Sequence, residues 1–325
     1  MSTTRRRFIA SSVAAAGLAS LTSRSASAEG ASFTALSKSN LPKPAFRYCL
    51  NTSTIRGQIQ AQTLDLVAQA KIAAKAGYIA IEPWMSHVHD AAKDGGSLKD
   101  AGKAIADLGL TVESGIGFAQ WIVDDDAKRE AGLEQARRDM DALAQIGGKR
   151  IAAPPSGATN QSDLNLFKAA ERYRKLCEVG ESIGVIPQVE VWGFSKSLSR
   201  LGESMFVCIE SGHPRACLLP DVYHVYKGGS DFAGLSLLSA GCVQVFHMND
   251  YPADPPRDTI RDGDRVHCGD GVAPLTDILR GLMINHSSAV LSLELFNKTY
   301  WEQDALEAAK TGLEKMKAAV AKAMA

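Results

Sequence analysis

The sequence lacks several of the patterns that define common classes of protein. None of its six cysteines lies in a C-x-x-C pair, so the spacing of a zinc finger is absent. Lysine plus arginine and aspartate plus glutamate balance at 36 each, which leaves no positive excess for binding nucleic acid. No G-x-G-x-x-G follows a strand-like run, and no glycine-rich phosphate cradle is visible. What remains is a globular composition of 325 residues, 45% hydrophobic and 22% charged.

Long apolar runs are also missing. The mildly apolar stretch at 9–21 is too short and too rich in small residues for a membrane helix. It follows Arg5 and Arg6 and precedes the small residues 26–28. This order predicts a twin-arginine export signal over 1–28 and a periplasmic protein, tethered to the membrane only if the signal stays uncleaved. Because that route exports folded proteins, often with a metal loaded, the signal also hints at a cofactor.

Eight short apolar runs of strand character recur along the rest of the chain. They begin at Arg47, Tyr78, Thr111, Arg150, Ile186, Ala216, Val243 and Ala289. Helical patterns fill the gaps, as at 64–77, which ends at a glycine suited to a C-cap. Eight strands alternating with helices predict the α/β class, a single-domain (β/α)8 TIM barrel over 47–325 after a polar linker at 29–46. A doubly wound open sheet is the alternative.

A glutamate interrupts the last apolar run, "AVLSLELF" at 289–296. Strand side chains alternate between faces, so Glu294 points away from the three leucines and toward the barrel axis. The run "IPQVEVWG" turns Glu190 the same way. Two strands therefore deliver a glutamate inward near their C-terminal ends, where barrels of this kind carry their active sites.

The two runs between these strands add polar groups at matching heights, Asp221 and His247. Three crowded carboxylates would repel one another, and a divalent cation removes that repulsion. Oxygen-rich coordination with one imidazole suits Mn²⁺ best, with Co²⁺, Zn²⁺ or Mg²⁺ as alternatives. We therefore predict one metal ion held by Glu190, Asp221, His247 and Glu294, although a buried ion pair is the alternative for any one of them alone.

These residues resemble the metal set of the xylose-isomerase-like barrel superfamily, in its sugar isomerase/epimerase branch. That branch includes tagatose 3-epimerase, hydroxypyruvate isomerase and the keto-inositol isomerases. The resemblance implies that His224, three residues after the aspartate, contacts substrate. The segment "PPRDTIRDGDRVHCGDG" at 255–271 resembles the keto-inositol isomerases and implies the same role for Arg265, although Cys268 stands where that group usually has proline. Glu82, in "IEPW", matches a substrate-side glutamate of relatives.

Two further residues are expected near the substrate. Trp192 lies at a strand end, where its ring can stack on a sugar face, although core packing is an equal alternative. Asp250 follows the strand that carries His247. Both therefore join His224, Arg265 and Glu82 as predicted substrate contacts.

The resemblance implies an enzyme that isomerises or epimerises a ketose, a keto-inositol or a related α-hydroxyketone. Glu190 and Glu294 would move protons through a metal-stabilised enediolate. A lyase or dehydratase acting on keto-inositols or 3-keto-glycosides is the alternative, since the same enediolate can expel a leaving group. A DNA-repair nuclease would need more than seven histidines and a basic surface, and a sugar-binding protein would not need the full ligand set. The expected partner is a small sugar or cyclitol, with no nucleic acid and no stable membrane insertion, while the substrate's phosphorylation and a homo-oligomeric state stay open.

Overall fold

The computed structural model describes residues 44–239, 241–286 and 288–325. The predicted export signal and most of the predicted linker lie outside the described residues. Within the described part, no helix is both long enough and apolar enough to cross a membrane.

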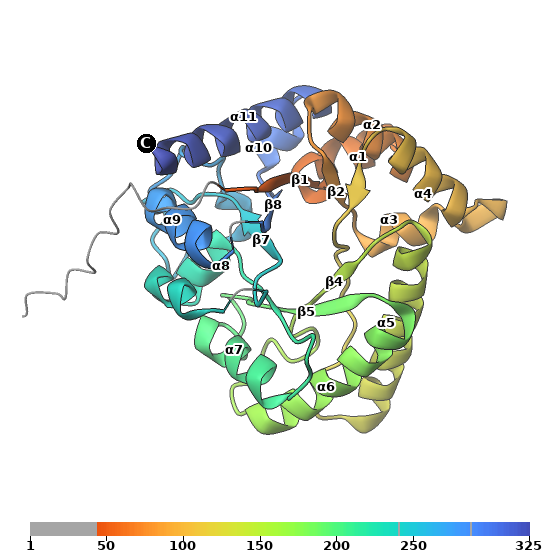
Figure 1. The fold of residues 1–325 in the computed structure, drawn as a ribbon, viewed down its shortest axis with the longest axis vertical. Coiled ribbons are helices and arrows are strands. Elements are labelled where there is room, and N and C mark those ends of the chain that lie inside the picture. The colour runs from red at the N-terminus through yellow and green to blue at the C-terminus, as the bar shows by residue number, and fades with distance from the viewer. Residues whose placement is uncertain (1–43, 240, 287) are drawn as a thin grey trace, which may run out of the picture. The chain divides into compact units, whose positions relative to one another are not determined.

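All eight predicted strands form, and they are parallel. Their bounds are β1 Arg47–Asn51, β2 Ala80–Glu82, β3 Thr111–Val112, β4 Arg150–Ala153, β5 Ile186–Glu190, β6 Leu218–Leu219, β7 Val245–Met248 and β8 Val290–Leu293. Hydrogen-bonded neighbours run in the order β3-β2-β1-β8-β7 and β4-β5-β6. Isolated parallel bridges between Gly115 and Ile151, and between Leu218 and Val243, join these two sheets at both seams. The strands therefore close into the predicted barrel, and the open-sheet alternative is wrong (Figure 1).

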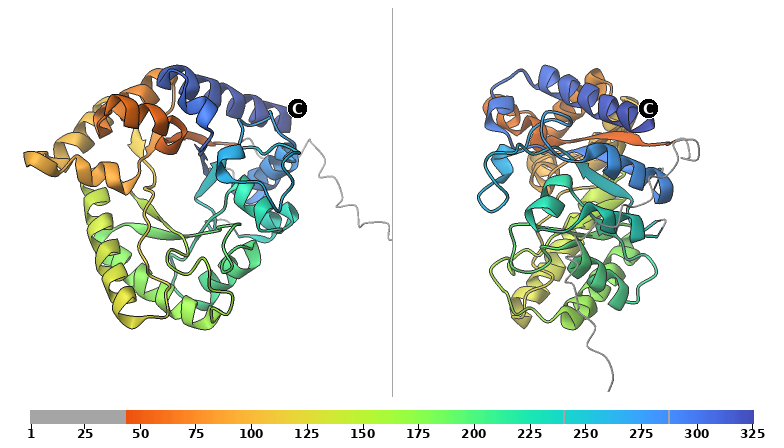
Figure 2. Two further views of the ribbon diagram at one scale, coloured as in Figure 1. Left: turned by 180° about the vertical axis from the view of Figure 1, so that it is seen from behind. Right: turned by 90° about the vertical axis from the view of Figure 1, so that its left-hand side faces the viewer.

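Helices surround the strands, as Figure 1 and Figure 2 show from three directions. The longer ones are α2 Leu66–Ala76, α4 Leu98–Asp107, α5 Asp126–Gln145, α6 Leu166–Ile183, α7 Leu201–Glu210, α9 Leu275–Asn285 and α11 Ala305–Met324. The shorter ones are α1 Arg56–Gln62, α3 Met85–Asp90, α8 Val222–Lys227 and α10 Lys298–Trp301. Local sequence explains the ends of α2: the Asp65 side chain accepts the Ala68 N–H, and Gly77 ends the helix at φ 95°.

Two predicted strands are reduced to two residues each, because the run at 111–118 contributes only Thr111–Val112 and the run at 216–224 is shortened in the same way. The run at 216–224 contributes only Leu218–Leu219 to the barrel, and helix α8 begins at Val222. The reason is Asp221, whose Oδ1 accepts the His224 N–H at 2.7 Å and so caps a new helix. His224 therefore lies in the first turn of α8 rather than on a strand.

The barrel interior consists of three layers. At the N-terminal end of the strands, Glu113 lies between Arg47 and Arg150. Small apolar side chains fill the middle, among them Cys49, Ala80, Ala152, Leu219, Val245 and Val290. At the C-terminal end the side chains are polar and buried, among them Asn51, Glu82, Gln188, Glu190, Asp221, His247 and Glu294.

The alternation predicted for β8 is confirmed. Leu291, Leu293 and Leu295 belong to the large core between strands and helices. Leu293 packs directly on α11 at Gly312, where a Cβ atom would come within 2.2 Å of the leucine Cδ2. Glycine at this helix position allows the last helix to approach the last strand, which leaves Glu294 on the opposite, inner face.

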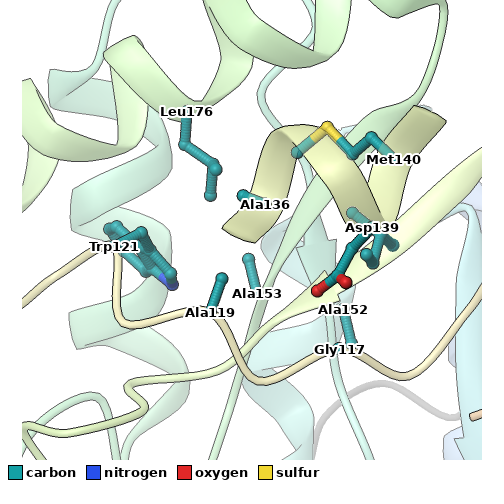
Figure 3. A pocket seen from close by; sticks show the side chains of 10 residues that line it. Gly117, Ala119, Trp121, Ala136, Asp139, Met140, Ala152, Ala153 and Leu176 are labelled. Atoms are coloured by element: carbon teal, nitrogen blue, oxygen red, sulfur yellow. The ribbon is translucent and has the colours of Figure 1, made fainter. Parts of the chain in front are cut away.

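A small internal cavity lies outside the barrel, between β4, α5 and the chain after β3 (Figure 3). Its volume is about 10 Å³, which is room for about one water molecule. Asp139 reaches it from α5: its Oδ1 lies 2.6 Å from His89 Nε2, and its Oδ2 has no hydrogen-bond partner among the described residues. The cavity is too small for an organic ligand, so it is not the candidate functional site.

Candidate metal and active site

Four ligand-type side chains meet at the C-terminal mouth of the barrel. Glu190 ends β5, Asp221 follows β6, His247 lies in β7 and Glu294 follows β8. These strands are neighbours, because β5 pairs with β6, β7 pairs with β8, and Asp221 bridges to His247. All four side chains are buried. The predicted convergence of these residues is what the structure shows.

Three of the four form a compact group. Ligand atoms of Glu190, His247 and Glu294 all lie within 4.8 Å of one another. His247 Nδ1 is 3.2 Å from Glu294 Oε2 and 4.0 Å from Glu190 Oε1. Neither His247 Nδ1 nor Glu190 Oε2 has a hydrogen-bond partner among the described residues. Buried polar atoms are normally satisfied, so this donor set fits a divalent cation that would complete it.

Glu82 fixes the orientation of the histidine. Its Oε2 lies 3.0 Å from His247 Nε2 and also accepts hydrogen bonds from Ser292 Oγ at 2.6 Å and Asn51 Nδ2 at 3.1 Å. A carboxylate on the far nitrogen is the usual orienting partner of a metal-binding histidine, because it leaves the other nitrogen as the ligand. The prediction placed Glu82 beside the substrate, whereas the structure places it behind the imidazole with no exposed surface.

The pKa values of these groups reflect several carboxylates that are buried close together. Burial, with Glu294 close by, raises the pKa of Glu190 to about 8. Burial also favours protonated Glu294, but His247 and Arg265 lower its pKa below the ordinary value. Burial disfavours a charged His247, yet Glu294 and Glu82 raise its pKa well above the ordinary value.

Arg265 reaches the cluster from the loop after β7, and its predicted contact with substrate stays a prediction. Its Nη1 donates to Glu294 Oε2 at 2.9 Å and to Asp221 Oδ2 at 3.2 Å, and its Nη2 lies 2.9 Å from His224 Nε2. The guanidinium is sandwiched between the rings of Tyr223 and Phe296, at 4.5 and 4.9 Å from their centroids. The arginine is therefore held rigidly, beside both the candidate ligands and His224.

Asp221 lies at the edge of the group. Its Oδ2 is 4.0 Å from His247 Nδ1 and accepts a hydrogen bond from Asn249 Nδ2 at 2.8 Å. Its Oδ1 caps α8. The carboxylate is thus adjacent to the three-residue group while already engaged by protein donors.

Asp250 has a different role from the predicted one. Its Oδ1 accepts the N–H groups of Tyr251 and Ala273, at 2.8 and 2.9 Å, and its Oδ2 accepts that of Gly269 at 2.9 Å. Its backbone exchanges two hydrogen bonds of 2.9 Å with Val266. The residue is buried and anchors both ends of the loop that carries Arg265, so the structure places it in support of the loop rather than against a substrate.

Asn51 is a site residue that the sequence analysis did not select. From the end of β1 its Nδ2 donates to Glu82 Oε2 and to Glu294 Oε1, both at 3.1 Å. It therefore links the orienting carboxylate to a candidate ligand. The same strand alternation that identified Glu294 was available for "RYCLN", where Asn51 shares a face with Cys49.

A row of aromatic side chains borders the mouth of the site; its members, here called the aromatic rim, are Trp84, Phe118, Trp192, Phe194 and Phe296. Neighbouring ring centroids are 5.1 to 6.1 Å apart along the order Phe296, Trp84, Phe118, Trp192, Phe194. Trp192, predicted to contact substrate, is a half-buried member of this rim.

Fold and site together define a (β/α)8 barrel with a candidate divalent-metal centre at its C-terminal mouth. The chain belongs to the xylose isomerase-like TIM barrel family, whose model matches residues 70–319. An inosose isomerase of Bacillus licheniformis is 26% identical over 194 residues, which are 59% of this chain and 69% of that protein. The structure of the IolI protein with a bound zinc atom has a TM-score of 0.77 at 21% identity, covering 85% of this chain and 99% of that one. An L-ribulose 3-epimerase structure has a TM-score of 0.68 at 17% identity, covering 86% and 95%.

Proposed function

We propose that this protein is a metal-dependent isomerase or epimerase of a sugar or cyclitol that carries an α-hydroxyketone. The observation that carries the proposal is the buried group of Glu190, His247 and Glu294, whose ligand atoms all lie within 4.8 Å of one another, with Glu190 Oε2 and His247 Nδ1 lacking hydrogen-bond partners among the described residues. Relatives named inosose isomerase, in the same family, support the substrate class.

Glu190, His247 and Glu294 would hold the ion, with Asp221 joining as the fourth ligand. Mn²⁺ is our preferred ion because three of the four ligands are carboxylates, and Zn²⁺, found in the IolI structure, is the main alternative. When bound, such an ion supplies Lewis-acid stabilisation of the negative charge that develops on the carbonyl oxygen.

The two glutamates would move the protons. Glu294 is held ionised by His247 and Arg265, which suits a base that removes a proton from the carbon next to the carbonyl. Glu190, whose ligand atom lies within 4.8 Å of that of Glu294, would return a proton to the substrate. Return to the same carbon gives an epimer, and return to the neighbouring carbon gives an isomer.

Arg265 and His224 would orient the substrate. The guanidinium is held over two rings, and its positive charge beside the proposed ligands would stabilise the negative charge of an enediolate oxygen. Above them the aromatic rim limits the access of water, which strengthens the electrostatic interactions below.

The experiment is proton exchange in D₂O. Metal-loaded protein is incubated with ketoses, keto-inositols and 3-keto-glycosides, and NMR detects deuterium on the carbon next to the carbonyl. Glu294→Gln should lower turnover about 10²–10⁴-fold while metal content is retained, because the amide cannot accept the proton.

The matched control is Glu113→Gln, which changes another glutamate inside the barrel and should leave turnover unchanged. Near wild-type turnover by folded, metal-loaded Glu294→Gln would contradict the mechanism, and release of water or an alcohol from the substrate would show a lyase instead.

A further inference from the structure

A second cavity lies next to the aromatic rim, beside the candidate metal centre. A cavity of about 430 Å³ lies between the segment after β5 and the loop after β7. Its lining consists of Phe194, Tyr223, Lys227 and residues 258–262. This volume falls within the range of about 300–1,000 Å³ that is typical of small-molecule sites.

Three wall residues of this cavity touch the residues that surround the candidate metal. The Tyr223 ring lies under the Arg265 guanidinium at 4.5 Å, and Asp262 forms an ion pair with the same arginine. The Phe194 ring centroid is 5.8 Å from that of His224. The side chains of Arg265 and His224 therefore separate the cavity from the reacting centre, and Phe194, which belongs both to the cavity wall and to the aromatic rim, connects the two at the mouth of the site.

The charge of the lining favours a neutral occupant. Two cations, Lys227 and Arg261, are balanced by two acids, Asp258 and Asp262. Lys227 Nζ already donates to two backbone carbonyl oxygens of the loop at 2.9 Å each. The lining carries no net positive charge to attract a phosphate group, whereas a sugar or aryl ring can stack on Phe194 and meet a polar wall.

The exposure of the rim supports the same conclusion. Phe194 is 47% exposed and Phe118 is 37% exposed, although both lie at the entrance to a buried polar site. Large exposed aromatic side chains grouped at a concave site mark a binding surface. The geometry points to a substrate of two rings: a keto-sugar ring at Glu190 and Glu294, and a second, uncharged ring in the cavity beside Phe194.

This inference rests on the proposed function, and one arm of its test does not use catalysis. Isothermal titration compares phenyl β-glucoside with glucose on wild type and on Phe194→Ala. We expect the phenyl glucoside to bind wild type at least tenfold more tightly than glucose, and that preference to disappear in Phe194→Ala. Phe167→Ala is the matched control, since Phe167 is exposed but packs on Phe206 away from the rim, and it should retain the preference.

The second arm compares kcat/KM for 3-ketoglucose, its 6-phosphate and phenyl 3-keto-β-glucoside. We expect the phenyl glycoside to exceed both single-ring substrates by at least tenfold, and Phe194→Ala to reduce that ratio, mainly through KM. Equal binding of glucose and phenyl glucoside, or a preference for the phosphate, overturns the two-ring assignment and leaves the proposed isomerase intact. Preferential binding of the phenyl glucoside without proton exchange on any ketone overturns the proposed function while the cavity keeps its ring-binding role.

Discussion

The two ends of the barrel interior both bury carboxylates among cations, yet they differ in how completely these groups are satisfied. At the N-terminal end, Glu113 Oε1 lies 2.8 Å from Arg47 Nη1, and its Oε2 lies 3.0 Å from Arg150 Nη1. Thr111 Oγ1 donates to the same carboxylate at 2.8 Å. Both carboxylate oxygens of this glutamate have protein partners, so this cluster needs no added ion or ligand.

At the C-terminal end the balance is different. The buried carboxylates of Glu82, Glu190, Asp221 and Glu294 lie around Arg265 and His247, and Glu190 Oε2 and His247 Nδ1 have no hydrogen-bond partners among the described residues. A buried cluster whose polar atoms are all hydrogen-bonded is complete by itself, whereas a cluster with unpaired polar atoms fits a ligand that would complete it. The predictions that follow test this difference.

The largest effect is expected from removing two ligands together. Asp221→Asn with His247→Ala should abolish stoichiometric metal binding, because half of the proposed ligands are lost. Metal content by elemental analysis checks this, with Glu113→Gln as the control that should still carry about one ion per chain. Wild-type affinity in the double variant would place the metal elsewhere.

Glu82→Gln should lower metal affinity about 10–100-fold, because a neutral amide holds His247 Nε2 more weakly and with less certain orientation. Competition with a chelator measures the effect. Glu203→Gln, which alters a helix-capping glutamate outside the cluster, should leave the affinity unchanged. If Glu82→Gln binds as tightly as wild type, the carboxylate does not orient the histidine.

At the opposite end, Glu113→Gln should lower the free energy of unfolding by about 2 kcal/mol and leave metal affinity unchanged. Removing one partner of a fully buried pair costs about 3–5 kcal/mol, and the partial exposure of Arg47 reduces that figure. Urea denaturation measures it. A parallel loss of metal would mean that the two ends are not independent.

The smallest effect concerns pH in metal-free protein. The pKa of Glu190 is raised from 4.5 to about 8, so the folded chain keeps a proton that the unfolded chain has released. Between these values Glu190 lowers stability as pH rises, by at most about 1.4 kcal/mol per pH unit. The free energy of unfolding of Glu190→Gln, compared with that of wild type, should therefore rise between pH 6 and pH 7. A constant difference between the two denaturation curves would show that Glu190 is ionised already.

The fold and the candidate metal ligands could be predicted from the sequence for the same reason. Apolar runs with a two-residue alternation identify strands, and a polar residue on the inward side of such a run is conspicuous, as Glu294 was. Alternation gives the direction of a side chain but not what lies in front of it. Glu82 was therefore predicted to contact substrate, although its carboxylate lies 3.0 Å from His247 Nε2 and is engaged by that imidazole.

Other features depend on long-range contacts that no local pattern records. Asp250 accepts N–H groups from residues 19 and 23 positions further along the chain. The short helices α3, α8 and α10 have four to six residues each, too few for a visible period, and tertiary packing holds them.

The anchoring by Asp250 has a consequence for how this scaffold can change. Residues 251–265 leave and rejoin the barrel at a single antiparallel bridge between Asp250 and Val266. A Cβ atom at Gly271 would lie 2.4 Å from Asp250 Oδ1, so the chain is tightly packed at the base of the loop. The exposed or half-buried stretch at 252–259 can thus be lengthened, shortened or exchanged above a base fixed by Asp250 and by the buried Ile260, with Arg265 kept in register. Altered selectivity can arise here by insertion and deletion, in nature or in a designed library, without rebuilding the reacting centre.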